Sequence, residues 1–158
     1  MKVVLRPVVL ALTSFLSLLP CMSWAQDEAV MTLARQNYIL NCQGCHLPDA
    51  MGAPGLVPRM KDFVGNFLHV EGGREFIVQV PGSANSPISD EELADVLNWM
   101  LDKFSKEQVP QGFQPYTGKE IGSLRARPLM DVNGTRAKLI ERIQKKLGIS
   151  EDALTRVE

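Results

Sequence analysis

Residues 42–46 of the chain read Cys42-Gln43-Gly44-Cys45-His46. Two cysteines separated by two residues, with a histidine directly after the second, form the attachment motif for a c-type haem. Each thiol adds across one vinyl group of the porphyrin, so the sulfurs must sit a fixed distance apart on one side of the ring. The histidine then lies under the iron and binds it as the proximal ligand. We therefore predict one covalent haem, held by Cys42 and Cys45 and ligated by His46.

Two other interpretations of this spacing fit the chain less well. Half of a zinc site would need further ligands, but Cys21 is the only other cysteine and His69 the only other histidine. A thioredoxin-like redox pair belongs in a βαβ context, and no such pattern surrounds the motif.

The start of the chain predicts export. Lys2 and Arg6 precede an apolar run over 8–19, and Ser23-Trp24-Ala25 supplies small residues around a cleavage point. This is the pattern of a secretory signal peptide, and the run is too short to span a membrane. We expect residues 1–25 to be removed, which leaves an exported, periplasmic chain without a membrane span.

Cys21 raises the alternative of a lipoprotein anchor, since Leu18 precedes it by three residues. Pro20 stands where a small residue is needed, so we favour the unanchored form. If Cys21 leaves with the signal peptide, only the two motif cysteines remain, and no structural disulfide is expected.

Charge divides the mature chain into two parts. Residues 26–104 hold five Lys/Arg against eleven Asp/Glu, whereas residues 105–158 hold ten against seven. Nothing in this balance suggests nucleic-acid binding, but the asymmetry could steer a charged partner. The mature length suits one domain, 26–104, followed by an appendage, 105–158.

Helical periodicity and a loop flank the motif. Val30, Leu33, Ala34 and Tyr38 give one apolar face to a predicted helix over 27–41. Residues 47–59 are rich in proline and glycine and predict a loop beside the haem. Its carbonyls are the expected acceptors for the second ring nitrogen of His46.

The next segments are shorter. Residues 61–68 predict a short helix, 74–80 fit a helix or a strand, and 80–87 predict a loop. Ser89 and Glu92 then form a capping box that opens the strongest helix of the chain. Its apolar stripe, with Trp99 beside it for a helix–helix crossing, consists of Leu93, Val96, Leu97, Met100, Leu101 and Phe104.

These residues carry a family resemblance. Residues 34–104 resemble a mono-haem class I cytochrome c, in the spacing of Ala34 and Tyr38 before the haem motif and in the terminal helix over 88–99. The resemblance implies a small all-α fold around one covalent haem c, in which the first and last helices cross and the haem edge is exposed.

The chain departs from that family at the sixth iron ligand. The resemblance implies a methionine on the loop before the last helix, but residues 80–88 contain neither methionine nor histidine. Met100, Met60 and His69 are the remaining candidates, beside water or no ligand. An open site could bind a small gas or peroxide.

The C-terminal extension is predicted to be helical. Residues 105–115 form a linker, a helix begins after Thr117 and stops before Pro128, and another lies within 131–147 before Gly148. Ser150 could begin a further helix. We expect the extension to brace the haem domain. The alternative is a docking surface for an acidic redox partner, formed by Arg136, Lys138, Arg142, Lys145 and Lys146.

The sequence thus predicts an all-α electron-transfer protein with one covalent haem c. It would shuttle electrons between exported partners such as a dehydrogenase, an oxidase or another cytochrome. No substrate-binding residues are evident, so we expect no enzymatic activity. The alternative function is a haem-based gas sensor or minor peroxidase with an open or weakly held sixth iron site.

Overall fold

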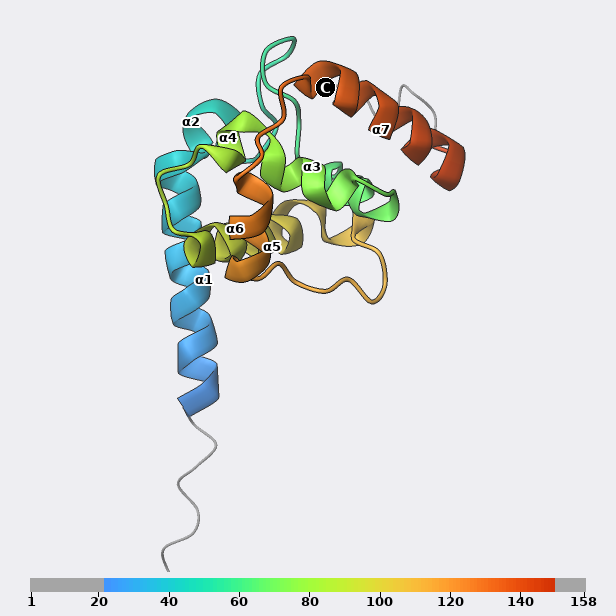
Figure 1. Cartoon of the computed structure of the whole chain (residues 1–158). Helices are drawn as coiled ribbons and strands as arrows, with labels where there is room; N and C mark the ends of the chain where they lie inside the picture. Colours follow the sequence, from blue (N-terminus) through green and yellow to red (C-terminus); the bar gives the residue numbers. More distant parts are fainter. Residues whose placement is uncertain (1–21, 150–158) are drawn as a thin grey trace, which may run out of the picture.

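The computed structural model describes residues 22–149, with side chains from residue 28 onward, and this part of the chain is helical (Figure 1). Its only extended pairing is an isolated bridge between Ala53 and Val57. The predicted all-α class is confirmed. The elements are α1 (Met22–Asn41), α2 (Gln43–His46), the 3-10 helix η1 (Val64–His69), α3 (Gly73–Gln79), α4 (Pro81–Ala84), α5 (Asp90–Ser105), the 3-10 helix η2 (Lys106–Gln108), α6 (Gly118–Arg125) and α7 (Val132–Leu147). Within the described residues, none of these helices is long and apolar enough to cross a bilayer.

Helices α1 and α5 cross through an aromatic cluster. The ring of Tyr38 on α1 lies 5.3 Å, centroid to centroid, from the rings of both Trp99 and Phe104 on α5. The Tyr38 hydroxyl donates a hydrogen bond to the Leu47 carbonyl at 2.8 Å. Burial, with the charges of Cys42 and Asp49, raises the pKa of Tyr38 to about 12, so the phenol stays protonated. This contact joins the crossing to the end of the cysteine motif.

The predicted capping box of α5 is present. The Ser89 hydroxyl accepts a hydrogen bond from the Glu92 amide at 3.1 Å, and the Glu92 carboxylate accepts one from the Ser89 amide at 2.8 Å. The apolar stripe predicted for this helix is buried along its whole length. A well-started amphipathic helix therefore supplies one wall of the core.

The C-terminal helices pack on the same core. Helix α6 lies against α5 and α3, and α7 lies against η1 and α3 (Figure 1). Tyr116, Ile121, Leu139 and Ile143 are buried in one cluster with residues of α1 and α5. The Asn98 side chain donates to the Tyr116 carbonyl at 3.0 Å and accepts from the Tyr116 amide at 2.8 Å, which fixes the chain entering α6.

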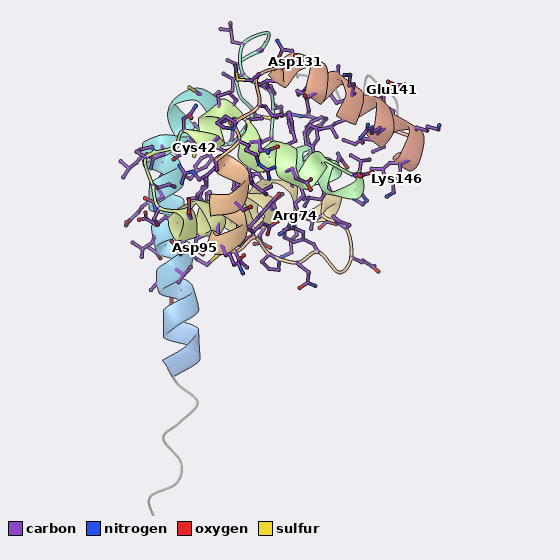
Figure 2. The ribbon with its side chains drawn as sticks, in the orientation of Figure 1. Cys42, Arg74, Asp95, Asp131, Glu141 and Lys146 are labelled. Carbon is purple, nitrogen blue, oxygen red and sulfur yellow. The ribbon has the colours of Figure 1, made fainter. Side chains whose placement is uncertain are left out.

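An arginine on α3 holds the same entering chain. Arg74 pairs with Glu120 through two contacts of 2.5 and 2.7 Å and donates to the Gln114 carbonyl at 2.7 Å. Its guanidinium carbon lies 4.1 Å from the centroid of the Tyr116 ring. The hydrogen bond with Glu120 raises the pKa of Arg74 and lowers that of Glu120. In Figure 2, Arg74 lies among the side chains that fill the space between α3 and this entering chain.

Several predicted boundaries differ from the structure. Helix α1 begins at Met22, five residues before the predicted start. The short helix predicted over 61–68 is a 3-10 helix that begins at Val64, and the segment 74–80 is the helix α3. Residues 1–21 of the predicted signal peptide and the predicted helix at Ser150 lie outside the described residues.

The prediction of a loop over 80–87 was wrong in part, because Pro81–Ala84 form helix α4. Pro81 is its first residue, where the fixed φ of proline suits a helix. The N–H of a first helical residue has no intrahelical acceptor, so proline loses no hydrogen bond there. The C-terminal helices α6 and α7 agree with the sequence. Thr117 caps α6, while Asp131 caps α7 and Gly148 ends it with a φ of 65°.

Candidate functional site

A cavity of about 630 Å³ lies between the cysteine motif, the following loop, α3, α4, α5 and the start of α7. This volume falls within the range of about 300–1,000 Å³ typical of cofactor and ligand sites. Most of its wall is apolar. The aromatic and aliphatic side chains from the core that line it are Phe63, Val64, Phe67, Phe76, Ile77, Leu93, Val96 and Leu97.

Cys42, Cys45 and His46 all line this cavity. Helix α1 ends at Asn41, and the amides of Cys45 and His46 then donate to the Cys42 carbonyl at 3.2 and 3.0 Å. This single turn of α2 brings both sulfurs and the imidazole to one wall, and Figure 2 shows Cys42 where α1 passes into α2. Cys42 is half-buried and Cys45 exposed. Burial raises the pKa of the Cys42 thiol.

The His46 ring is half-buried and has an unpartnered nitrogen. Burial lowers the pKa of His46, and the Pro58 carbonyl acts in the opposite direction. Among the described residues, however, no acceptor is aligned for a hydrogen bond with the buried His46 Nδ1. The loop does place the expected kind of acceptor, the Pro58 carbonyl, beside the His46 ring, but its alignment with Nδ1 falls short of a hydrogen bond in this geometry. Burial favours the neutral imidazole, which is the form that binds a metal.

The loop after the motif is folded tightly against the histidine. The Gly52 amide donates to the His46 carbonyl at 3.1 Å, and the Ala53 amide donates to the Val57 carbonyl at 3.0 Å. Gly52 has a φ of 68°, and a Cβ there would lie 2.9 Å from the Pro58 carbonyl oxygen as well as overlapping that of Val57. Only glycine fits this position, which brings Val57 and Pro58 to the cavity wall.

These features fit a covalently held haem. Two thiols and an imidazole converge on one wall, the volume suits a cofactor, and the opposing surfaces are apolar. Within the described part of the chain, no group of three or more His, Cys, Asp or Glu side chains could hold a metal ion. A porphyrin would supply the remaining in-plane ligands of a metal bound at His46.

The three candidates for the sixth iron ligand lie in different places. Met100 on α5 is 4% exposed, Met60 is half-buried, and both line the cavity. His69 lies outside it, with its Nε2 atom 2.9 Å from the Gln108 carbonyl oxygen. The structure therefore brings the two methionines, but not His69, to the cavity that Cys42 and His46 line.

Sequence reasoning missed part of the cavity wall. Arg59, from the loop, and Arg136, from α7, are the only Lys or Arg residues among the described residues lining it, and no Asp or Glu lines it. Arg136 falls in the basic run noted above, but spacing gave no sign that it faces inward. Ser86 also lines the cavity, and its buried hydroxyl has no partner among the described residues.

A residue of α6 holds the segment that contains Ser86. Arg125 donates to the Ala84 carbonyl at 3.1 Å, to the Ile88 carbonyl at 2.9 Å and to the Ser86 carbonyl. It also pairs with Asp90 at 3.1 Å. This is the loop in which the family resemblance implies a sixth ligand, so the C-terminal part of the chain fixes its backbone.

Similar proteins include two named cytochrome c-552, from Thermus thermophilus and from its strain ATCC 27634. Each is 32% identical to this chain in an alignment 126 positions long that covers 68% of this chain. The alignments cover 92% of the first relative and 81% of the second. No protein-family model matches the chain.

Proposed function

Since the chain belongs to the c-type cytochromes, we propose that it shuttles single electrons between exported redox partners by means of its covalent haem c. The observation that carries this proposal is the convergence of Cys42, Cys45 and His46 on one apolar cavity. The bound haem would supply a one-electron iron couple. In this proposal the protein is a carrier rather than an enzyme.

Each motif residue has a distinct role in this proposal. Cys42 and Cys45 form the two thioether links, and His46 holds the iron from the proximal side. The apolar wall from α3 and α5 excludes water from the haem. Fewer water molecules then have to reorient when the charge of the iron changes. The crossing of α1 and α5 keeps the motif in place through the Tyr38 hydroxyl and the Leu47 carbonyl.

The attachment can be tested on the exported protein. Unfolding it and extracting with acidified organic solvent should leave the colour on the chain. The C42A and C45A variants should each retain one link, seen as a shifted pyridine haemochrome band, and C42A/C45A should release the haem entirely. If the unaltered protein loses its colour on extraction, the attachment proposal is wrong.

For the sixth ligand we place Met100 first. It is the more deeply buried of the two methionines that line the cavity. The oxidised protein should then show a methionine–iron charge-transfer band that disappears in M100L and persists in M60L. H69Q is a matched control, because His69 lies outside the cavity. Loss of the band in M60L alone would assign the ligand to Met60.

A second candidate function is reversible binding of a small ligand at an open sixth site. The buried, unpartnered Ser86 hydroxyl favours it, because it could donate a hydrogen bond to such a ligand. Carbon monoxide should then bind the reduced protein rapidly, and S86A should release it faster. A methionine charge-transfer band together with slow, weak carbon monoxide binding would reject this candidate.

The predicted location follows from the start of the chain. The segment 1–25 has the pattern of a cleaved signal peptide, so we propose an exported, periplasmic protein. The mature N-terminus, read by mass spectrometry from a periplasmic fraction, should be Gln26. Recovery of the uncleaved chain, or of a lipid on Cys21, would contradict this location and form.

A further inference from the structure

The cavity carries positive charge without a matching acid. Arg59 and Arg136 line it, and no Asp or Glu among the described residues does so. This is unusual in a region where residues 26–104 carry more than twice as many acidic as basic side chains. An apolar cavity bordered by two guanidinium groups favours an anionic occupant.

Arg136 is the more informative of the two arginines, because it comes from α7 in the predicted C-terminal extension. It is half-buried, and burial lowers its pKa. Its guanidinium carbon lies 5.4 Å from the centroid of the Phe63 ring. Among the described residues it makes no ion pair and no side-chain hydrogen bond, whereas Arg74 and Arg125 pair with Glu120 and Asp90.

A half-buried cation without an acidic partner is unfavourable until an anion reaches it. Val132 and Asn133, the first two residues of α7, line the cavity together with Arg136. Asp131, which caps α7, bonds to the Gly134 amide at 2.9 Å and does not line the cavity. The Asp131 carboxylate, five residues before Arg136, is therefore engaged at the helix cap, and Glu141, five residues after it, is exposed and does not line the cavity.

We propose that Arg136 binds a propionate carboxylate of the haem, so that α7 forms part of the cofactor site. The inference rests on the proposed function, because it requires the haem in this cavity. A guanidinium group is suited to a carboxylate, since it can donate two parallel hydrogen bonds. Arg59, in the loop after the cysteine motif, lines the same cavity and would supply a second cation for the propionates.

A contact between Arg136 and a propionate should change the reduction potential of the haem iron. A positive charge that neutralises a propionate disfavours the oxidised, more positive iron, so Arg136 should raise the reduction potential. In the holoprotein, R136Q should lower the midpoint potential, on the order of a tenfold change in the reduction equilibrium or about 59 mV for one electron. K138Q is the matched control, because Lys138 lies two residues away on α7 and is exposed.

R136K provides a second test and remains useful if R136Q does not accumulate as holoprotein. Lysine keeps the charge but loses the two-pronged geometry, so the potential should fall by less than in R136Q and by more than in K138R. A midpoint potential of R136Q within error of that of K138Q, or of R136K within error of that of K138R, overturns the proposal.

Covalent haem must be confirmed in each variant. Absence of covalent haem in the unaltered protein would reject the proposed function, whereas unchanged potentials with haem attached would reject only the role of Arg136.

Discussion

Gly73 shows how closely one residue can be constrained. It is the first residue of α3, and a Cβ there would overlap the backbone carbonyl of Phe67 in η1. Because backbone cannot move aside as a side chain can, G73A should lower the free energy of unfolding by about 1–3 kcal/mol, the usual cost of overpacking a core. Urea unfolding of the holoprotein, followed by far-UV circular dichroism, would measure it.

Gly118 supplies a matched control, because it is the first residue of α6. The three atoms nearest to a Cβ at Gly118 would all belong to the Glu91 side chain, the closest at 2.7 Å, and that exposed side chain can rotate away. G118A should therefore change stability by less than about 0.5 kcal/mol, as surface substitutions usually do. Equal losses in both variants would contradict the explanation based on the Phe67 backbone.

The Arg74–Glu120 pair predicts a pH dependence of stability. The hydrogen bond from Arg74 lowers the pKa of Glu120 in the folded protein, so the ionised carboxylate stabilises the fold above the pKa of the unfolded chain. This stability is lost as pH falls below the ordinary glutamate pKa of 4.5 and through the lower pKa of the folded protein. At pH 7, E120Q should cost about 1–2 kcal/mol, reduced from the full value of a charged hydrogen bond by partial exposure.

The difference between E120Q and the unaltered protein should shrink as pH falls from 5 to 3, as thermal unfolding at each pH would show. D102N serves as a control, because the Asp102–Lys106 pair spans one turn with side chains 54% and 71% exposed. Such exposed pairs contribute little, so D102N should leave the pH profile nearly unchanged. A pH-independent difference for E120Q would mean that the loss arises from packing rather than from charge.

At the scale of elements, the capping box of α5 matters because this helix contributes a wall of both the core and the cavity. S89A removes the hydroxyl that accepts from the Glu92 amide and should lower the free energy of unfolding by about 1 kcal/mol. Ser123 on α6 is an exposed serine inside a helix. S123A makes the same chemical change without touching a cap, so chemical denaturation should find it neutral or slightly stabilising. A loss in S123A equal to that in S89A would refute the capping argument.

The sequence was most informative where local rules decide the structure. Helix α5 carried a capping box and a stripe at helical spacing, and α7 ended at a glycine, so both could be predicted. Helix α4 is one turn long and held partly from outside, through the contacts of Arg125 with the Ala84 and Ser86 carbonyls. Such a short element depends on tertiary contacts, which residue order alone does not reveal.

The same limit applies to the candidate site. Cys42, Cys45 and His46 could be identified because one helical turn brings neighbouring residues together. Arg136 lies ninety positions after His46 in the chain, and its place on the cavity wall depends on how α7 packs against η1. Because Arg136 belongs to a run of basic residues, the sequence suggested that it lies on an outward-facing surface. Only the fold distinguishes an inward-facing arginine from its exposed neighbours.

At the scale of the whole molecule, the basic run on α7 is not one surface. Arg136 faces the cavity, Arg142 donates to the Glu71 carbonyl at 3.2 Å, and Lys146 donates to the His69 carbonyl at 2.5 Å. Lys138 and Lys145 are exposed and make no hydrogen bond or ion pair with the described residues. Figure 2 marks the two ends of α7 with Asp131 and Lys146.

If an acidic redox partner docks on this helix, K138E/K145E should slow electron exchange at low ionic strength, and the difference should disappear at high salt. Stopped-flow mixing with an acidic redox protein would measure the rate. K61E/K103E, which reverses two exposed lysines before the extension, controls for net charge. Equal slowing in both double variants would indicate a general charge effect and reject docking on α7.

Buried residues of the C-terminal helices share one core with the haem region, so the two parts should unfold together. Ile143 on α7 is fully buried and belongs to one cluster with Tyr38 and Leu97. Removing most of its side chain in I143A should cost about 2–5 kcal/mol. If the extension and the haem region form one cooperative unit, denaturation of I143A should be a single transition. The free energy of unfolding should then fall by this amount whether it is followed by visible haem absorbance or by far-UV circular dichroism. M130A is the control, because Met130 lies in the same extension, between α6 and α7, but is 97% exposed, so neither transition should move. An I143A variant whose circular dichroism shifts while the haem signal does not would instead show that residues 105–158 unfold as a separate unit, with the predicted boundary after residue 104 also a boundary of stability.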